Sequence, residues 1–352
     1  MSISLFCPET NRDDAKAASD VVKLGWVGPG KKVEQFEQEL AQYVGRKYCV
    51  ATSSGTAAIM AALLAHRSAH GKEVLVAPAC GHPAAINAAL ALGYKIELCD
   101  VHSRTGCMSQ GDLAYIMGTS VGEQGGILAF IEHNGRTSDT QDAYEVIPEK
   151  YRDRWMFLQD SCQSMHADGK PVGDVTVVSF SPQKIITTGQ GGAVLTDKES
   201  MKEYLQRVVS QGIARGTGLP HRPQGFGVNL RMSDVSAAIG LSQLSRIEKK
   251  KAVWRRIRSY YDERRDWVWC PCVQTENAVE LLTALAAELV WAARLYVPAT
   301  CNPLVLSRAK VFGDLSGSRN MSHDTVYLPG HHKVSHAQVL QIRKVVERYG
   351  GR

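Results

Sequence analysis

The sequence predicts an α/β protein with a mostly parallel central sheet and a smaller C-terminal α+β domain. Three observations support this prediction. A length of 352 residues is enough for one large and one smaller domain. Residues 1–200 alternate short β-rich runs with helical stretches, which is typical of parallel strands joined by helices. Several of the β-rich runs are apolar throughout, as expected of strands covered on both faces. We expect the larger domain at residues 1–245 and the smaller one at residues 246–352.

The individual elements follow from residue type and periodicity. Runs rich in β-branched and aromatic residues, bounded by turn-forming residues, indicate strands. The candidate strands are Tyr48–Ala51, Glu73–Ala77, Lys95–Cys99, Ile127–Ile131, Trp155–Leu158, Val175–Phe180 and Ala193–Leu195. The segments Thr56–Ala65 and Pro83–Ala91 have helical patterns and fall between these runs.

A long helix is expected from about Val235 to Tyr261. Apolar residues recur there at three-, four- and seven-residue steps and form one apolar face. The opposite face is strongly basic, with seven lysines and arginines between positions 246 and 258. We interpret this face as the solvated side of a helix that joins the two domains, rather than as a nucleic-acid surface.

Composition is that of an ordinary soluble enzyme. Hydrophobic residues make up 44% and charged residues 22% of the chain, and the net charge of +6 is mild. The N-terminus lacks a basic segment followed by an apolar one, so we expect no signal peptide, and the apolar stretches are too short for a membrane span. Nine scattered cysteines, an odd number, favour reduced thiols and a cytoplasmic location.

Two strand ends carry residues suited to a ligand. Thr52-Ser-Ser-Gly-Thr56 follows a strand and opens a helix, so its free backbone N–H groups can form a phosphate site. The run Trp155–Asp160 ends in an acid, with Gln163 shortly after, at the strand end where open α/β sheets bind ligands. For both segments the alternative is simple helix capping.

A lysine and a later polar turn add to this pattern. Lys184 follows the strand Val175–Phe180 and precedes a glycine-rich turn, which favours a crevice over the solvated surface that a lone lysine usually occupies. Asn229 and Arg231 precede the long helix and are suited either to binding an anion or to fixing the turn. Together these features supply an amine for an imine, an acid for a pyridine nitrogen and donors for a phosphate.

The order of these segments resembles the DegT/DnrJ/EryC1/StrS family of PLP-dependent sugar aminotransferases. The resemblance covers roughly residues 20–245 and returns faintly at Tyr327-Leu-Pro-Gly-His331. The segments that carry it are Gly25-Trp-Val-Gly-Pro-Gly30, Val33-Glu-Gln-Phe-Glu37, Ser53-Ser-Gly-Thr-Ala-Ala58, Gln159-Asp-Ser-Cys-Gln163, Ser179-Phe-Ser-Pro-Gln-Lys184, Thr187-Thr-Gly-Gln-Gly-Gly-Ala-Val194, Gly227–Arg231 and Ala237-Ala-Ile-Gly240.

The resemblance implies a PLP-dependent transferase of fold type I, like aspartate aminotransferase, that forms a homodimer with shared active sites. It implies pyridoxal 5′-phosphate (PLP) as cofactor and no metal. Lys184 would hold the cofactor as a Schiff base and act as general acid and base, and Asp160 would pair with the pyridinium nitrogen. The residues implied to bind the cofactor are Gly55, Thr56, His82, Asp160, Gln163, Ser179, Lys184 and Asn229.

Each of these binding positions has an implied role. Gly55, Thr56 and Ser179 would hold the phosphate, and Asn229 would reach it from the partner subunit. Gln163 would contact the ring hydroxyl, and His82 would stack on the ring, where the family usually has an aromatic residue.

The chain also departs from the family pattern. Gln190 replaces a usual glutamate, and Glu132 occupies a position that is often histidine. From Asp266 to Asp324 the expected substrate-contacting pattern is shortened and largely unrecognisable. Members that dehydrate their substrate have histidine in place of the lysine, so Lys184 favours amino transfer. The implied reaction moves an amino group from an amino acid, glutamate by family expectation, to a keto sugar or related ketone.

Three other interpretations remain open on the sequence. Gly25–Lys31 fits the GxxxxGK pattern of a P-loop nucleotide site, although Lys32 stands where Ser or Thr is needed. The divergent C-terminal region is compatible with an inactive partner subunit or regulator. His331, His332 and His336 are close enough in sequence to suggest zinc, but lack Cys or acidic ligands at regular spacing.

Overall fold

The computed structural model confirms an α/β fold with a mostly parallel central sheet. It describes residues 2–71, 73–165, 167, 169–213, 223–261 and 268–350. Eight strands form the sheet in the order β1-β7-β6-β5-β4-β2-β3-β9, and only β7 runs against the others. The strands are β1 (Tyr48–Thr52), β2 (Val74–Pro78), β3 (Lys95–Cys99), β4 (Gly126–Ile131), β5 (Trp155–Asp160), β6 (Val175–Ser179), β7 (Gly192–Thr196), β8 (Cys272–Gln274), β9 (Ala309–Val311) and β10 (Thr325–Tyr327).

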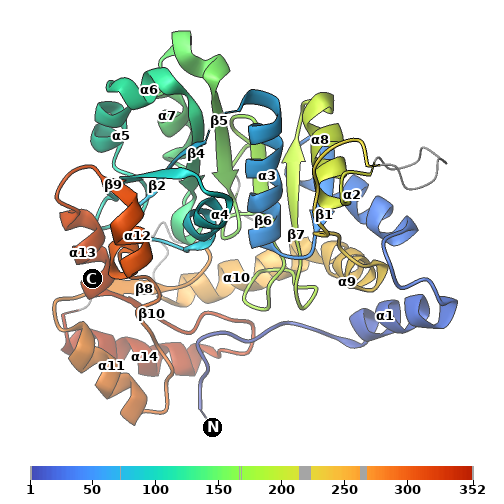
Figure 1. The fold of residues 1–352 in the computed structure, drawn as a ribbon. Coiled ribbons are helices and arrows are strands. Elements are labelled where there is room, and N and C mark those ends of the chain that lie inside the picture. The colour runs from blue at the N-terminus through green and yellow to red at the C-terminus, as the bar shows by residue number, and fades with distance from the viewer. Residues whose placement is uncertain are drawn as a thin grey trace.

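Helices cover both faces of this sheet (Figure 1). The helices of residues 1–245 are α1 (Arg12–Leu24), α2 (Lys31–Val44), α3 (Gly55–His70), α4 (Ala84–Leu92), α5 (Gln110–Met117), α6 (Ser120–Gln124), η1 (His133–Gly135), α7 (Thr140–Glu145), η2 (Glu149–Arg154), α8 (Glu199–Val209) and α9 (Asp234–Leu244). Those that follow are α10 (Ile247–Tyr261), α11 (Ala278–Ala287), η3 (Ala299–Cys301), α12 (Pro303–Arg308), α13 (Ser316–Asp324) and α14 (His336–Arg348).

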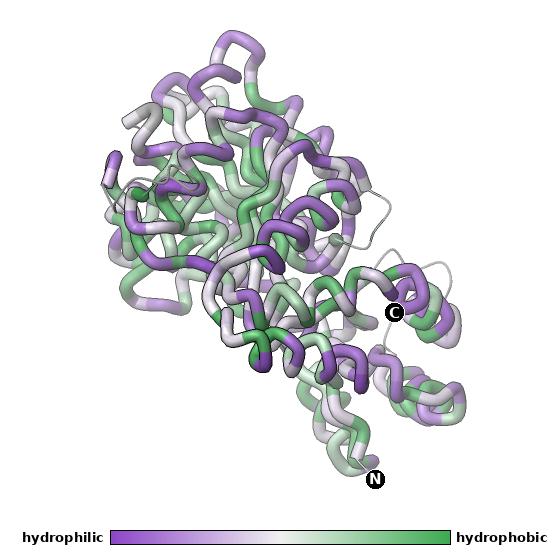
Figure 2. The backbone as a smooth tube through the Cα atoms, turned by 90° about the vertical axis from the view of Figure 1, so that its right-hand side faces the viewer, coloured by the Kyte–Doolittle hydropathy of each residue, from purple (hydrophilic) through white to green (hydrophobic). Residues whose placement is uncertain are grey.

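Successive side chains of each strand are buried against the helices on opposite faces of the sheet. On β1, Val50 packs with α3 and α4, whereas Cys49 and Ala51 pack with α2 and α9. On β5, Leu158 joins the first of these layers, and Phe157 joins the layer of α5 and α7. This two-sided burial explains the continuous apolar runs in the sequence, and Figure 2 shows hydrophobic residues running through the interior.

The chain after α9 builds a second layer below the sheet. Helices α10, α11 and α14 share a hydrophobic core with the antiparallel pair β8–β10. The N-terminal segment reaches the same layer, because Ile3 bridges to Val290 (Figure 1). Strand β9 does not belong to this second layer but pairs with β3 at the edge of the central sheet. The division of the chain at residue 245 stays a prediction.

The prediction of one continuous helix from Val235 to Tyr261 is wrong. Helix α9 ends at Leu244 and α10 begins at Ile247; between them Arg246 N donates to the Gln243 carbonyl oxygen at 3.2 Å, a tighter turn than the α-helical one. The Arg246 side chain pairs with α1, and its Nη2 lies 3.1 Å from Asp14 Oδ2. The basic face is also less solvated than expected. The Lys250 side chain is 2% exposed and its Nζ donates to the Glu9 carbonyl oxygen at 3.2 Å.

Within the described part of the chain, no helix combines the length and the apolar character that crossing a membrane requires.

Candidate active site

The carboxyl ends of β5 and β6 and the start of α3 surround one cavity of about 370 Å³. Ligands of open parallel sheets bind at this edge. The cavity brings together seven of the eight predicted site residues, namely Gly55, Thr56, His82, Asp160, Gln163, Ser179 and Lys184. The eighth, Asn229, does not line it. Its side chain is exposed and accepts a hydrogen bond from Arg231 Nε at 3.1 Å.

The start of α3 is shaped to hold an anion. Ser54 caps the helix by accepting a hydrogen bond from Ala57 N at 3.0 Å. The N–H groups of Gly55 and Thr56 open the helix, where no intrahelical acceptor exists, so they are available to a ligand. A Cβ on Gly55 would lie 2.9 Å from Ser179 Cβ, which shows how closely the hydroxyl of Ser179 approaches this helix start.

Asp160 ends β5 and is 5% exposed. Its Oδ1 accepts a hydrogen bond from Cys162 N at 3.0 Å and so fixes the turn that follows; residues 162–165 form a turn rather than the helix that the capping interpretation expected. The same side chain also lines the cavity, and capping through one oxygen leaves acceptor capacity for a ligand.

Lys184 is half-buried and lines the same cavity. Its Nζ lies 4.8 Å from the centre of the Trp269 indole. Burial lowers the pKa of Lys184, and this effect outweighs the opposing charges of Cys162 and Asp160. A lowered pKa places more of the amine in the neutral form, which is the form that attacks a carbonyl carbon and accepts a proton.

Gln163 and His82 already have protein partners. Gln163 Oε1 accepts from Asn134 N at 2.5 Å, and its Nε2 donates to the Tyr296 hydroxyl at 2.7 Å. His82 Nδ1 accepts from Ala84 N at 3.3 Å at the start of α4, which orients the ring. Desolvation lowers the pKa of His82, so its ring is neutral at neutral pH.

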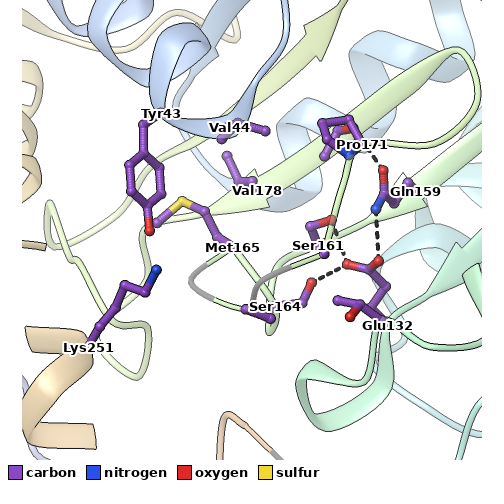
Figure 3. A pocket seen from close by; sticks show the side chains of 14 residues that line it. Tyr43, Val44, Glu132, Gln159, Ser161, Ser164, Met165, Pro171, Val178 and Lys251 are labelled. Carbon is purple, nitrogen blue, oxygen red and sulfur yellow. Dashed lines mark hydrogen bonds between the residues drawn. The ribbon is translucent and has the colours of Figure 1, made fainter. Parts of the chain in front are cut away.

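A buried hydrogen-bond network beneath the site explains why Glu132 stands at a position where the family often has histidine. Glu132 is 1% exposed, follows β4, and accepts hydrogen bonds from Ser161 Oγ and Gln159 Nε2 at 2.7 and 2.8 Å and from Ser164 Oγ (Figure 3). Thr140 Oγ1 adds a fourth at 2.7 Å. Ser161 and Ser164 belong to the turn that carries Asp160 and Gln163, so Glu132 anchors that turn.

The P-loop interpretation of Gly25–Lys31 is wrong. The segment joins two helices, since Gly25 ends α1 and Gly30 precedes α2, whereas a P-loop follows a strand. The anion at this helix start is the protein's own Asp234, which accepts from Gly30 N at 2.8 Å and Val33 N at 2.9 Å.

Comparison with known proteins identifies the family. The model of the DegT/DnrJ/EryC1/StrS aminotransferase family matches residues 8–267. The chain belongs to this family. It is 26% identical over 266 residues to a GDP-perosamine synthase of Vibrio cholerae, a match that covers 74% of this chain and 70% of the relative. It is 29% identical over 253 residues to a UDP-4-amino-4,6-dideoxy-N-acetyl-beta-L-altrosamine transaminase of Campylobacter jejuni, covering 70% and 64%.

Solved structures share the whole fold. The E. coli GDP-4-keto-6-deoxy-D-mannose-3-dehydratase with bound hydrated PLP superimposes with a TM-score of 0.87 at 18% identity, over 98% of this chain and 99% of that chain. Such low identity establishes the fold alone. With the family match, it confirms the type I transferase fold, and the chain is a PLP-dependent aminotransferase.

The residues of the cavity fit the cofactor that the family uses. The uncapped N–H groups of Gly55 and Thr56, with the adjacent Ser179 hydroxyl, suit a phosphate. Asp160 would offer its carboxylate to a ring nitrogen, and Lys184 would offer a desolvated amine. A Cβ on Gly192 would lie 2.5 Å from the Ser54 carbonyl carbon, so backbone packs directly against the helix start that forms this cradle.

Sequence reasoning missed part of the cavity wall. Phe6, Trp269, Leu295 and Tyr296 line the cavity, and they come from the N-terminal segment and the divergent region after α10. Asp266, which begins that region, lies outside the described residues. No signal in the sequence placed these side chains, because the segments that carry them show neither a helical nor a strand period.

Proposed function

We propose that the chain transfers an amino group from glutamate to a keto sugar, free or nucleotide-linked. The observation that carries this proposal is Lys184, a desolvated lysine that lines the same cavity as Asp160, at the position where dehydrating members of the family have histidine. The named activities of the relatives from V. cholerae and C. jejuni support a nucleotide-linked amino sugar as product.

In this proposal, the cofactor supplies an electron sink when bound, and the protein supplies binding and proton transfer. Lys184 takes the proton from Cα of the amino donor and delivers it to C4′ of the cofactor, a role that typically contributes about 10²–10⁴-fold to the rate. Asp160 keeps the ring nitrogen protonated, while Gly55, Thr56 and Ser179 bind the phosphate. Gln163 and His82 position the ring.

We further propose a homodimer that works in the cytoplasm and shares its active sites. Asn229 lies outside its own cavity and exposed, which suits a residue that serves the phosphate of the partner subunit. All nine cysteines are free thiols, in keeping with a reducing compartment. Mixed dimers of Lys184→Ala with an inactive Asn229 variant should recover up to about half the activity per dimer, because one of the two sites is then intact. Mixed dimers that stay inactive would disprove sharing.

A single half-reaction tests the proposed chemistry without knowledge of the acceptor. Holoenzyme mixed with glutamate alone should release 2-oxoglutarate in proportion to active sites, and Lys184→Ala should release none. If the wild type binds PLP but no common amino acid yields its keto acid, the chain is an inactive partner subunit or regulator. If 2-oxoglutarate is released, a panel of keto sugars should be tested as acceptors, with the amine product identified by mass spectrometry.

A further inference from the structure

Cys7, His331 and His332 form a cluster of potential metal ligands outside the cofactor cavity. One ligand atom from each residue lies within 4.8 Å of those of the other two. Cys7 precedes α1, and the two histidines follow β10 in the loop that leads to α14. The cluster therefore joins the two ends of the chain, and its geometry is a product of the fold rather than of neighbouring positions in sequence.

The hydrogen bonds of His331 prepare one ring nitrogen for a metal. Its Nε2 lies 2.9 Å from the carbonyl oxygen of Ser4, which accepts only, so Nε2 carries the hydrogen. Nδ1 then has the lone pair. It accepts a long hydrogen bond of 3.3 Å from Lys333 N, which a metal would replace. A histidine that donates its second N–H to a backbone carbonyl is the usual arrangement at zinc sites.

The space beside the cluster fits a single ion. The three side chains line a cavity of about 20 Å³, and a cavity of about 10–15 Å³ already holds one water molecule. Glu9 lines the same cavity. Its Oε2 is buried and lies 3.4 Å from Lys250 Nζ, but it has no hydrogen-bond partner among the described residues. Because this carboxylate is paired with Lys250 and lies outside the group of three ligand atoms, the fourth position is left to a water molecule.

We propose that Cys7, His331 and His332 bind one structural zinc ion, with a water molecule in the fourth position. A thiolate with two imidazoles selects zinc over magnesium and calcium, which prefer oxygen ligands. On binding, the Cys7 thiol loses its proton to solvent and a sulfur–zinc bond forms, without any change in oxidation state. His336, grouped with the other two histidines on sequence grounds, is not a ligand, since it stacks on Tyr260 at 4.5 Å.

The site has a structural consequence for the cofactor cavity. Phe6, next to Cys7, stacks on Trp269 with ring centres 5.2 Å apart, and the Trp269 ring in turn lies beside Lys184 Nζ. Zinc would fix the N-terminal segment against the loop of His331 and His332 and so hold this aromatic wall in place. None of the three ligands lines the cofactor cavity, so we assign the ion a structural role rather than a role in amino transfer.

The test is a zinc titration of untagged holoenzyme against a chromophoric chelator, with metal content of the purified protein as a second measurement. Cys7→Ser and His332→Ala should each weaken binding by more than about 100-fold, since even outer-shell partners contribute about 10–100-fold. The matched controls are Cys301→Ser, which removes an exposed thiol outside the cluster, and His336→Ala. Both controls should keep wild-type affinity.

Cobalt substitution gives an independent signature at wavelengths where PLP does not absorb. Tetrahedral Co²⁺ with a thiolate ligand should show d–d bands in the red, and Cys7→Ser should lose them. Should the variants fold poorly, zinc added to the wild type should protect Cys7, and not Cys301, from alkylation. Absence of zinc binding, binding unaffected by Cys7→Ser and His332→Ala, or loss of binding in the controls would each overturn the proposal.

Discussion

Replacing Glu132 tests whether the buried network beneath the active site stabilises the protein as its hydrogen bonds indicate. Oε1 accepts from Thr140 and Gln159, and Oε2 accepts from Ser161 and Ser164. The informative comparison is between Glu132→Gln, which keeps the shape and loses the charge, and Glu132→Ala, which removes the acceptor altogether.

The glutamine variant has one favourable orientation. Gln159 must keep donating to position 132, because its own Oε1 accepts from Val172 N at 2.8 Å and Thr176 Oγ1 at 3.1 Å and so cannot exchange places with Nε2. The new amide nitrogen therefore faces the two serine hydroxyls, which can rotate to accept. Only charge assistance is lost, and a neutral side chain is cheaper to bury, so the expected loss of stability is about 1 kcal/mol.

The alanine variant leaves all four donors without an acceptor. Each buried donor left unpaired costs about 1–3 kcal/mol, and rotation of the hydroxyls recovers part of this, so we expect a loss of about 3–5 kcal/mol. Urea unfolding of the apo-protein, monitored by fluorescence and circular dichroism, measures both losses. Glu149→Ala, at an exposed glutamate before β5, is the control and should change stability by less than about 0.5 kcal/mol. Equal losses for the alanine and glutamine variants would refute the reasoning.

The remaining predictions concern the cofactor. Borohydride should fix PLP to the peptide of Lys184, and Lys184→Ala should bind PLP reversibly but lack turnover; an adduct on another lysine would contradict the assignment. Capture of PLP by the apo-protein should rise with pH with a midpoint below 10.5, the usual lysine value, and Asp160→Asn should lower that midpoint further, because the carboxylate raises the pKa of Lys184. An unchanged midpoint would show that the charge of Asp160 does not affect the pKa of Lys184. Gly55→Ala should weaken PLP binding at least about tenfold through the clash with Ser179, an overpacking cost of about 1–3 kcal/mol, whereas Gly111→Ala, with open space around it, should not.

The strands of the central sheet could be predicted because burial on both faces leaves a continuous apolar run. All seven candidate strands exist, and they differ from the observed ones by at most two residues at either end; the largest difference is Trp155–Leu158 against Trp155–Asp160. Strands β8, β9 and β10 were missed, because three residues are too short to show a period. The break between α9 and α10 was missed because the apolar period continues across it, and the pairing of Arg246 with Asp14 at this point joins positions far apart in the sequence.

The site likewise has a part that follows from local sequence patterns and a part that depends on packing between distant segments. Gly55, Asp160, Ser179 and Lys184 could be placed together because each stands at or just beyond the end of a sheet strand that the pattern identifies, and such ends meet at one edge. The aromatic part of the cavity wall could not be predicted. Its aromatic residues come from connecting segments whose position depends on packing between the second layer and the sheet.

The aromatic part of the cavity wall nevertheless affects the pKa of Lys184, and Trp269→Ala tests in which direction. The indole acts in two opposing ways: its bulk excludes water, which lowers the lysine pKa, and its ring face attracts the ammonium ion, which raises it. A cation–π contact of about 0.5–1 kcal/mol corresponds to less than one pKa unit, at about 1.36 kcal/mol per unit, whereas desolvation shifts buried lysines by up to about 3–5 units. Removing the ring should therefore raise the pKa of Lys184 and move the pH midpoint of PLP capture upward, toward 10.5. Trp269→Phe, which keeps most of the bulk, should move the midpoint much less. A downward shift in Trp269→Ala would mean that attraction by the ring, rather than exclusion of water, governs the reactive amine.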